Sequence, residues 1–247
     1  MKRAVTFFTF SCALLSAAVL FTTEHRQLAR ASGAVVARQS SQASQPNGDS
    51  YVYADFESVQ NNRTVSNNGG QVQLFAYQET TPSRFKGLAN SAPPAPELVR
   101  LKPDDPNRAA AFDYELYSPN QYAGVSMEVH GQADKDGKPV ADDLSAYKFL
   151  SLQIYSTGVP SLRVEFISRG QGLNLASGFP QYTFKIKPGF NTYKIPLGSL
   201  AQPSWAETRL NNKDVLKKLT SISLSAYCER CAPVKGTVVV DNIIFQK

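Results

Sequence analysis

The chain has 247 residues, 42% of them hydrophobic, and a formal net charge of +6 at pH 7. Residues 1–31 hold Lys2, Arg3, Arg26 and Arg30 but only one acid, so the remainder carries 22 basic and 19 acidic side chains, a net charge of +3. These lysines and arginines are scattered along the chain, whereas a protein that follows nucleic-acid phosphates needs a basic stripe. The composition therefore argues against nucleic acid as a partner.

The N-terminus predicts export. A basic start is followed by the apolar run AVTFFTFSCALLSAAVLF, the pattern of a secretory signal peptide. Ala29-Arg30-Ala31 offers a cleavage site between small residues, so residues 1–31 are assigned to the signal. The alternative is an uncleaved membrane anchor, because residues 4–22 approach the roughly 20 apolar residues that span a bilayer. Under both interpretations the rest of the chain is exported and is periplasmic, secreted or associated with the cell envelope.

Residues 32–50 are rich in Ser, Gln, Ala and Gly and contain no aromatic residue before Tyr51. Such a composition predicts a flexible linker. The packed part then spans residues 51–247, which is one domain with ample length for a hydrophobic core.

Strand patterns dominate residues 51–247, as alternating or β-branched runs bounded by Gly, Pro, Asn and Asp. They fall at 51–57, 71–77, 110–118, 123–131, 148–156, 161–169, 181–188, 190–197, 220–227 and 237–245. Residues 214–219 offer one short helix, and the Pro-rich stretch 78–107 predicts a long loop with a short edge strand at 98–101. The fold class expected is all-β, an antiparallel β-sandwich.

Alternation assigns the two faces of each strand. Apolar side chains such as Phe112, Val125, Leu152 and Val164 take one face and predict a core. The opposite faces of four strands carry polar and aromatic side chains, which are Glu115, Tyr117, Glu128, His130, Gln153, Tyr155, Arg163 and Glu165. If these strands are neighbours in one sheet, the eight side chains line a single groove.

Cys228 and Cys231 form a C-x-x-C pair between strand-like segments. A zinc site is implausible, because His130 is the only histidine beyond the signal and zinc needs four ligands. A thioredoxin-type redox motif opens a helix, and no helix follows here. A disulfide that closes a tight loop in an oxidising compartment explains the pair better.

Several stretches together resemble a known family. They are YADFES (53–58), FDYELYSPNQYAGVSMEV (112–129), DDLSAYKFLSLQIYS (142–156), FNTYKIPLGSL (190–200) and VVVDNIIF (238–245). In this order they resemble galactose-binding-like jelly rolls, in particular family 11 carbohydrate-binding modules and the complex I intermediate-associated protein domain. The resemblance implies a two-sheet jelly roll, a structural calcium ion and a glycan-binding groove. Trp205, the only tryptophan, takes a position where this family packs an aromatic ring beneath the sheet edge, and the alternative is a platform on which a sugar ring stacks.

Asp241 interrupts the apolar run at the C-terminus, where an unpaired buried carboxylate costs several kcal/mol. Either the run is an edge strand that exposes Asp241 to water, or a cation neutralises it. Asp55 and Glu57 leave the same face of the first strand, and the resemblance places the first and last strands together. The three carboxylates are therefore a candidate calcium site, because calcium takes six to eight oxygen ligands.

Non-catalytic glycan binding is the leading hypothesis for function. Aromatic rings stack on sugar rings, while carboxylates, amides and guanidinium groups bind hydroxyls. A protein-interaction or assembly module of the same fold at the cell envelope is the alternative. A glycoside-active enzyme using Glu115 and Glu128 as paired carboxylates is a further alternative, although no motif ties these residues to a catalytic scaffold.

Overall fold

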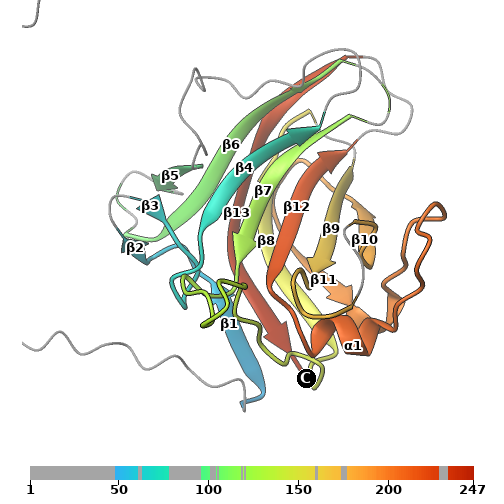
Figure 1. Cartoon of the computed structure of the whole chain (residues 1–247). Helices are drawn as coiled ribbons and strands as arrows, with labels where there is room; N and C mark the ends of the chain where they lie inside the picture. Colours follow the sequence, from blue (N-terminus) through green and yellow to red (C-terminus); the bar gives the residue numbers. More distant parts are fainter. Residues whose placement is uncertain are drawn as a thin grey trace, which may run out of the picture. The chain divides into compact units, whose positions relative to one another are not determined.

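Two antiparallel β-sheets pack face to face in the computed structural model (Figure 1). The structure describes residues 48–60, 63–77, 96–100, 104, 106–117, 119, 121–158, 161–173, 177–227 and 233–247. The segment 1–31, nearly all of the linker 32–50, and both Cys228 and Cys231 lie outside these residues. Within the described ranges, no helix has the length and apolar character to cross a membrane.

Sheet 1 has the strand order β11-β8-β13-β6-β5, and β1 also pairs with β13. Its strands are β1 (Ser50–Ala54), β5 (Glu97–Arg100), β6 (Arg108–Leu116), β8 (Phe149–Ser156), β11 (Gly189–Pro196) and β13 (Val234–Gln246). Sheet 2 has the order β10-β9-β12-β7-β4. Its strands are β4 (Val72–Tyr77), β7 (Tyr122–Glu128), β9 (Ser161–Ile167), β10 (Gln181–Lys185) and β12 (Ser221–Tyr227).

Three small elements complete the described structure. Strands β2 (Val59–Gln60) and β3 (Arg63–Thr64) form a separate two-stranded sheet, and η1 (Leu197–Ser199) follows β11. Helix α1 (Asn212–Leu216) begins where the Asn211 side chain accepts a hydrogen bond from the Lys213 N–H, as expected of an N-cap. All ten strands expected from the sequence are present, and so are the edge strand near residues 98–101 and the short helix.

The core takes side chains from the inner faces of both sheets, as alternation predicts. Phe112 and Leu152 from sheet 1 and Val125 and Val164 from sheet 2 belong to one buried cluster. Full burial of each such side chain stabilises the fold by roughly 1.5–3 kcal/mol. The face assignments made from the sequence are confirmed for these strands.

Strand β13 lies inside sheet 1, so the edge-strand interpretation of Asp241 is wrong. It pairs with β8 along one side, and along the other it pairs first with β6 through Val234–Val240 and then with β1 through Ile243–Gln246. The register against β8 shifts between Asp241 and Ile244, and Asn242 has φ 48°. Such a bulge kinks a strand and interrupts its ladder. Asp241-Asn242 therefore marks the point where β13 exchanges one neighbour for another.

Candidate functional site

The eight polar and aromatic residues predicted to line one groove are divided between the two sheets. Glu115 lies on β6 of sheet 1, and Gln153 and Tyr155 lie on β8 of the same sheet, with Tyr117 just after β6. Glu128, Arg163 and Glu165 lie on β7 and β9 of sheet 2. The single groove over four neighbouring strands is wrong, because alternation assigns a face of a strand but does not choose the sheet that the strand joins.

The same division removes the basis of the enzymatic alternative. Glu115 and Glu128 project from the outer faces of opposite sheets, on strands β6 and β7. Packed sheets are separated by about 10 Å between their backbones alone, and the two side chains point away from each other. A pair of glycosidase carboxylates has to flank one glycosidic bond. These two glutamates do not meet that condition.

On the outer face of sheet 1, the predicted residues bond mainly to neighbouring side chains. The Tyr117 hydroxyl donates to Oε2 of Glu115, and Nδ2 of Asn242 donates to Oε1 of Gln153 at 3.2 Å. Tyr155 is 37% exposed and lies opposite Phe190 of β11, which is 43% exposed. Tyr155 thus faces solvent as predicted, beside a second aromatic side chain that the sequence analysis did not select.

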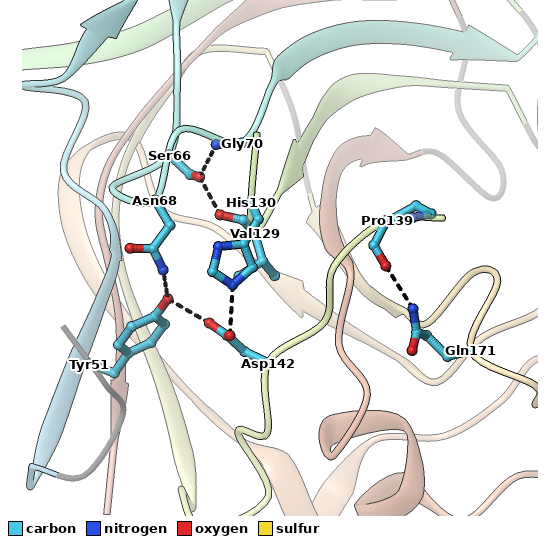
Figure 2. Close-up of polar contacts among 9 residues, drawn as sticks. All are labelled: Tyr51, Ser66, Asn68, Gly70, Val129, His130, Pro139, Asp142 and Gln171. Atoms are coloured by element: carbon cyan, nitrogen blue, oxygen red, sulfur yellow. Dashed lines mark hydrogen bonds and ion pairs between the residues drawn. The ribbon is translucent and has the colours of Figure 1, made fainter. Parts of the chain in front are cut away.

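His130 belongs to a polar network beyond the end of β7 (Figure 2). Its Nε2 lies 2.8 Å from Oδ1 of Asp142, and Oδ2 of Asp142 accepts a hydrogen bond from the Tyr51 hydroxyl at 2.9 Å. Nδ2 of Asn68 donates to the same hydroxyl at 2.6 Å. Burial and the neighbouring Asp142 raise the pKa of Tyr51, so its hydroxyl stays protonated and donates to the carboxylate. The network ties β1 to the loops beside it.

The outer face of sheet 2 has short side chains at its centre and long ones on both sides. Register places Gly124 and Ser126 of β7 opposite Ser225 and Ser223 of β12. The flanking strands present Phe75 and Gln73 from β4, and Arg163 and Glu165 from β9. Tyr122 and Tyr227 pair at one end of the face, and Glu128 and Ser221 pair at the other. We call this set of residues the serine face.

Gly124 leaves the centre of the serine face without a side chain that projects from the sheet. A Cβ atom at this position would lie 2.2 Å from the carbonyl oxygen of Leu224 on β12. Real Cβ atoms do not approach backbone so closely, so the spacing of β7 and β12 here requires glycine. The neighbouring hydroxyls form a floor, where Oγ of Ser223 donates to Oγ of Ser126 at 3.4 Å.

Arg163 is held between two aromatic rings. Its guanidinium carbon lies 4.6 Å from the ring centroid of Tyr122 and 4.7 Å from that of Tyr227. Phe75 meets Tyr122 edge to face with centroids 5.9 Å apart. Cation–π contacts of this kind contribute about 0.5–2 kcal/mol each. The arrangement fixes a planar cluster of donors above the serine floor.

Glu165 adds a carboxylate beside this cluster. Burial raises the pKa of Glu165, while Arg163, Arg169 and the backbone N–H of Phe179 act in the opposite direction. A guanidinium group donates hydrogen bonds to a hydroxyl-rich ligand, an ionised carboxylate accepts them from it, and hydroxyls do both. The predicted residues Arg163 and Glu165 are thus placed together, and Glu128 closes the far end of the same face.

Trp205 is not packed beneath the sheet edge, so that expectation is wrong. Its ring is 65% exposed and lies against Gly178, where a Cβ atom would come within 2.9 Å of the ring. Gly178 also has φ +75°, in the left-handed region that favours glycine. Gly178 precedes Phe179, whose N–H contacts Glu165, so Trp205 stands near the Glu165 side of sheet 2.

The sequence analysis missed Phe75, Tyr122 and Tyr227 as members of this face. A signal was present for all three, and alternation with the buried Val72 and Leu74 places Phe75 outward. Alternation that places Ser126 and Glu128 outward also places Tyr122 outward, and the run SISLSAY places Tyr227 on the same side as its serines. No local signal brings these tyrosines to Arg163, because the three residues come from different strands.

Asp241 is fully buried, and amide groups surround its carboxylate. Oδ2 accepts from Nδ2 of Asn107 at 3.0 Å and from Nδ2 of Asn242 at 2.9 Å, and Oδ1 accepts from the Asn242 N–H at 2.7 Å. Burial raises the pKa of Asp241, Glu57 and Asp55 raise it further, and the bonds from Asn107 and Asn242 lower it. The charges of Glu57 and Asp55 thus act on Asp241. However, β1 ends at Ala54 and Phe56 has φ 56°, so Asp55 and Glu57 lie beyond the first strand and do not leave one face of it as predicted.

Asp55 and Glu57 also accept hydrogen bonds in this structure. Asp55 accepts from Nδ2 of Asn67 at 3.1 Å, and Oε1 of Glu57 accepts from the Arg108 N–H at 2.5 Å. Across the described ranges, no group of three acidic, histidine or cysteine side chains is close enough to hold a metal ion. The shared calcium ion remains a prediction, as does the disulfide between Cys228 and Cys231.

Comparison with solved structures identifies the fold. The chain is similar to a family 11 carbohydrate-binding module from Clostridium thermocellum in complex with a β-1,3-1,4-mixed-linked tetrasaccharide, with a TM-score of 0.51 and 16% identity over 80% of this chain and 95% of that one. It is also similar to the family 11 module of a cellulosomal cellulase of Clostridium thermocellum (TM-score 0.48, 16% identity, covering 80% and 94%).

A family 30 module of another cellulosomal cellulase from the same organism has a TM-score of 0.44 and 12% identity, over 71% of this chain and 92% of that one. No protein-family model and no curated protein matches the chain. The likeness to the module solved with the tetrasaccharide, at a TM-score of 0.51, shows that the chain has the β-sandwich fold of a carbohydrate-binding module, as the resemblance in its sequence implied.

Proposed function

We propose that the protein is an exported, non-catalytic module that binds an oligosaccharide or polysaccharide on the serine face. The observation that carries this proposal is the guanidinium of Arg163, held between Tyr122 and Tyr227 beside a floor of serine hydroxyls. Likeness in fold to a module solved with a tetrasaccharide supports the proposal. The signal-like N-terminus and the linker fit a binding domain tethered outside the cell.

The chemistry of the face matches a saccharide. Sugar hydroxyls both donate and accept, and so do the serine hydroxyls, whereas Arg163 only donates and an ionised Glu165 only accepts. Aromatic rings at the border offer apolar surface for the C–H groups of a sugar ring. The strands β9, β12, β7 and β4 are neighbours in sheet 2. Because adjacent strands lie about 4.8 Å apart, the four span roughly 14 Å across the sheet. This width suits an oligosaccharide better than a single sugar.

Two tyrosine variants test the assignment of the face. Tyr227→Ala removes one ring beside Arg163 on sheet 2, and Tyr155→Ala removes an exposed ring on sheet 1. We expect Tyr227→Ala to weaken binding by about 1–3 kcal/mol, by analogy with base–aromatic stacking. The measurement is calorimetric titration of the full chain with a mixed-linked β-glucan tetrasaccharide and a panel of neutral oligosaccharides.

The sequence analysis proposed Tyr155 as a ligand residue, so its variant decides between the two faces. Loss of binding in Tyr155→Ala with none in Tyr227→Ala would move the site to sheet 1. Unchanged thermal stability of Tyr155→Ala would agree with its exposure. If a saccharide binds and neither variant changes the affinity, the serine face is not the site. If no saccharide binds, glycan recognition fails and an envelope protein becomes the preferred partner.

The structural calcium ion expected from the sequence completes the proposal. Carboxylate oxygens of Asp55, Glu57 and Asp241 are the ligands that calcium prefers. The amide groups of Asn107 and Asn242 point at Asp241, and exchange of their nitrogen and oxygen atoms by rotation turns donors into oxygen ligands. When bound, the ion would supply positive charge to a buried carboxylate that now depends on amide donors alone.

A further inference from the structure

A cavity of about 850 Å³ lies at one end of the sandwich, apart from the serine face. Three segments form it: the residues that lead into β8, those that follow β11, and the loop that leads into α1. None of the residues of the serine face lines this cavity. We call it the basic cavity, for the charges described next.

The charged side chains that line the basic cavity are all cations. Lys148, Arg209 and Lys213 line it, and no aspartate or glutamate does. A fourth cation borders it, because Nζ of Lys194 lies 4.1 Å from the ring centroid of Phe149, which is also in the lining. Within the described part of the chain, none of these four cations forms an ion pair.

Acidic residues occur close by but are directed elsewhere or stand outside the lining. Oδ1 of Asp143 accepts from the N–H and the hydroxyl of Ser145, and Asp214 lies in the first turn of α1. Like charges gathered without partners repel one another. An anion in the cavity would remove this repulsion.

Tyr147 contributes to the wall of the cavity, but its hydroxyl lies in the core. The residue is 3% exposed, and its ring packs against those of Tyr51 and Phe245, with centroids 6.5 and 6.0 Å apart. The hydroxyl is enclosed, so a ligand in the cavity does not reach it. The cations are therefore the groups that face a ligand.

The walls of the cavity are held in place by their own hydrogen bonds. Gln202 donates to the carbonyls of Gly178 and Thr208 at 2.9 and 3.0 Å and accepts from the Leu210 N–H at 2.6 Å. The Arg209 guanidinium donates to the carbonyls of Pro203 and Ser204 at 3.2 and 3.1 Å. The loop thus presents Arg209 in a fixed position instead of leaving it to move freely in solvent.

We propose that the basic cavity is a second saccharide site, specific for an acidic sugar residue. The carboxylate of a uronate would contact Arg209, Lys213 and Lys148, and a hydroxyl of the sugar would contact Asn211. The partly exposed side chains of Phe149 and Leu210 provide apolar surface for the sugar ring. The saccharide nature of the ligand rests on the proposed function, whereas its negative charge rests on the cavity alone.

Titration of the full chain with an oligogalacturonate tests the proposal, with a neutral oligosaccharide and a sulfated one of the same length as comparison ligands. We expect the oligogalacturonate to bind, the neutral ligand to bind here at least tenfold more weakly, and affinity to fall with salt. Lys213→Gln and Lys148→Gln should each weaken uronate binding by about tenfold. Lys217→Gln, at an exposed lysine outside the lining, is the matched control.

An equal loss of uronate affinity in Lys217→Gln would mean that only the overall charge of the protein matters, and would overturn the site. Preference for the sulfated ligand would overturn its assignment to a carboxylate, and so would absence of uronate binding. Tyr227→Ala separates the two proposals, because it should weaken neutral glycan binding and leave uronate binding unchanged. If the protein binds the uronate but no neutral glycan, the serine face is not a glycan site, whereas the proposal for the basic cavity stands.

Discussion

The outer faces of the two sheets use similar residues in different ways. On sheet 1, polar side chains pair with one another, as Thr237 does with Asp113 at 2.6 Å and Asn242 with Gln153. Ala109, Ala111 and Val239 on the same sheet form a small apolar cluster. On sheet 2, short serines border an arginine held by two tyrosines. Polar composition alone does not mark a binding face; the arrangement of long and short side chains does.

The largest expected effect is at the floor of the serine face. Gly124→Ala places a Cβ atom 2.2 Å from the Leu224 carbonyl, which forces β7 and β12 apart. We expect destabilisation of roughly 3 kcal/mol or more, at the upper end of what overpacking causes. Urea unfolding measures it. Gly137→Ala is the matched control, because its Cβ meets no atom within 4 Å although its φ is also unfavourable for alanine. Similar losses in both variants would contradict tight packing at Gly124.

Calcium should raise the free energy of unfolding of the protein by binding at Asp241 on sheet 1. An ion that binds only the folded state adds about 2.7 kcal/mol at a hundredfold excess over its Kd. Asp241→Asn should remove most of this increment, since an amide attracts the ion less than a carboxylate does. Without metal the same variant should be no less stable, because burial and the nearby Glu57 and Asp55 raise the pKa of Asp241 and disfavour its charge.

Thermal unfolding of the wild-type protein and of Asp241→Asn, with calcium and with a chelator, measures this difference. Glu97→Gln on β5 is the control for removal of an exposed acid from the same sheet. A wild-type midpoint that does not respond to the chelator would rule out the metal site.

Paired polar groups on sheet 1 should matter for stability and not for binding. Thr237→Val removes the hydroxyl that donates to Asp113 and leaves the shape of the side chain. We expect a loss of about 1–2 kcal/mol, because this hydrogen bond is to a charged group. Ser126→Ala, at a partly exposed serine on sheet 2, should instead weaken saccharide binding with little change in stability. Urea unfolding and calorimetric titration of both variants make the comparison, and a reversal of the two effects would contradict it.

The smallest effect concerns the pH dependence of stability through Glu165. Burial raises the pKa of Glu165 above its ordinary value of 4.5, so the folded protein binds the proton more tightly than the unfolded chain does. Stability from this group is therefore present below pH 4.5 and falls as pH rises through the raised pKa. Glu165→Gln should flatten that part of the profile in urea unfolding between pH 4 and 8. Glu207→Gln, at an exposed glutamate, should not.

Much of the fold was predictable because the information is local. Alternation over five to nine residues places Phe112 and Val164 in the core, and the bounded β-branched runs mark every major strand. The resemblance also implied that the first and last strands meet, and β1 pairs with β13. The outward direction of Tyr155, Arg163 and Glu165 followed from the same alternation.

Sheet membership was decided only in three dimensions, since strands pair across long stretches of chain. β7 lies beside β12, about a hundred residues later, so Tyr122 meets Tyr227 and both meet Arg163 of β9. β13 kinks at Asp241-Asn242, because one side of β13 pairs with β6 before this point and with β1 after it. The basic cavity likewise joins Lys148, Arg209 and Lys213 from separate segments. A side chain's face depends on its own strand, but its neighbours depend on pairings and packing that no single stretch of sequence specifies.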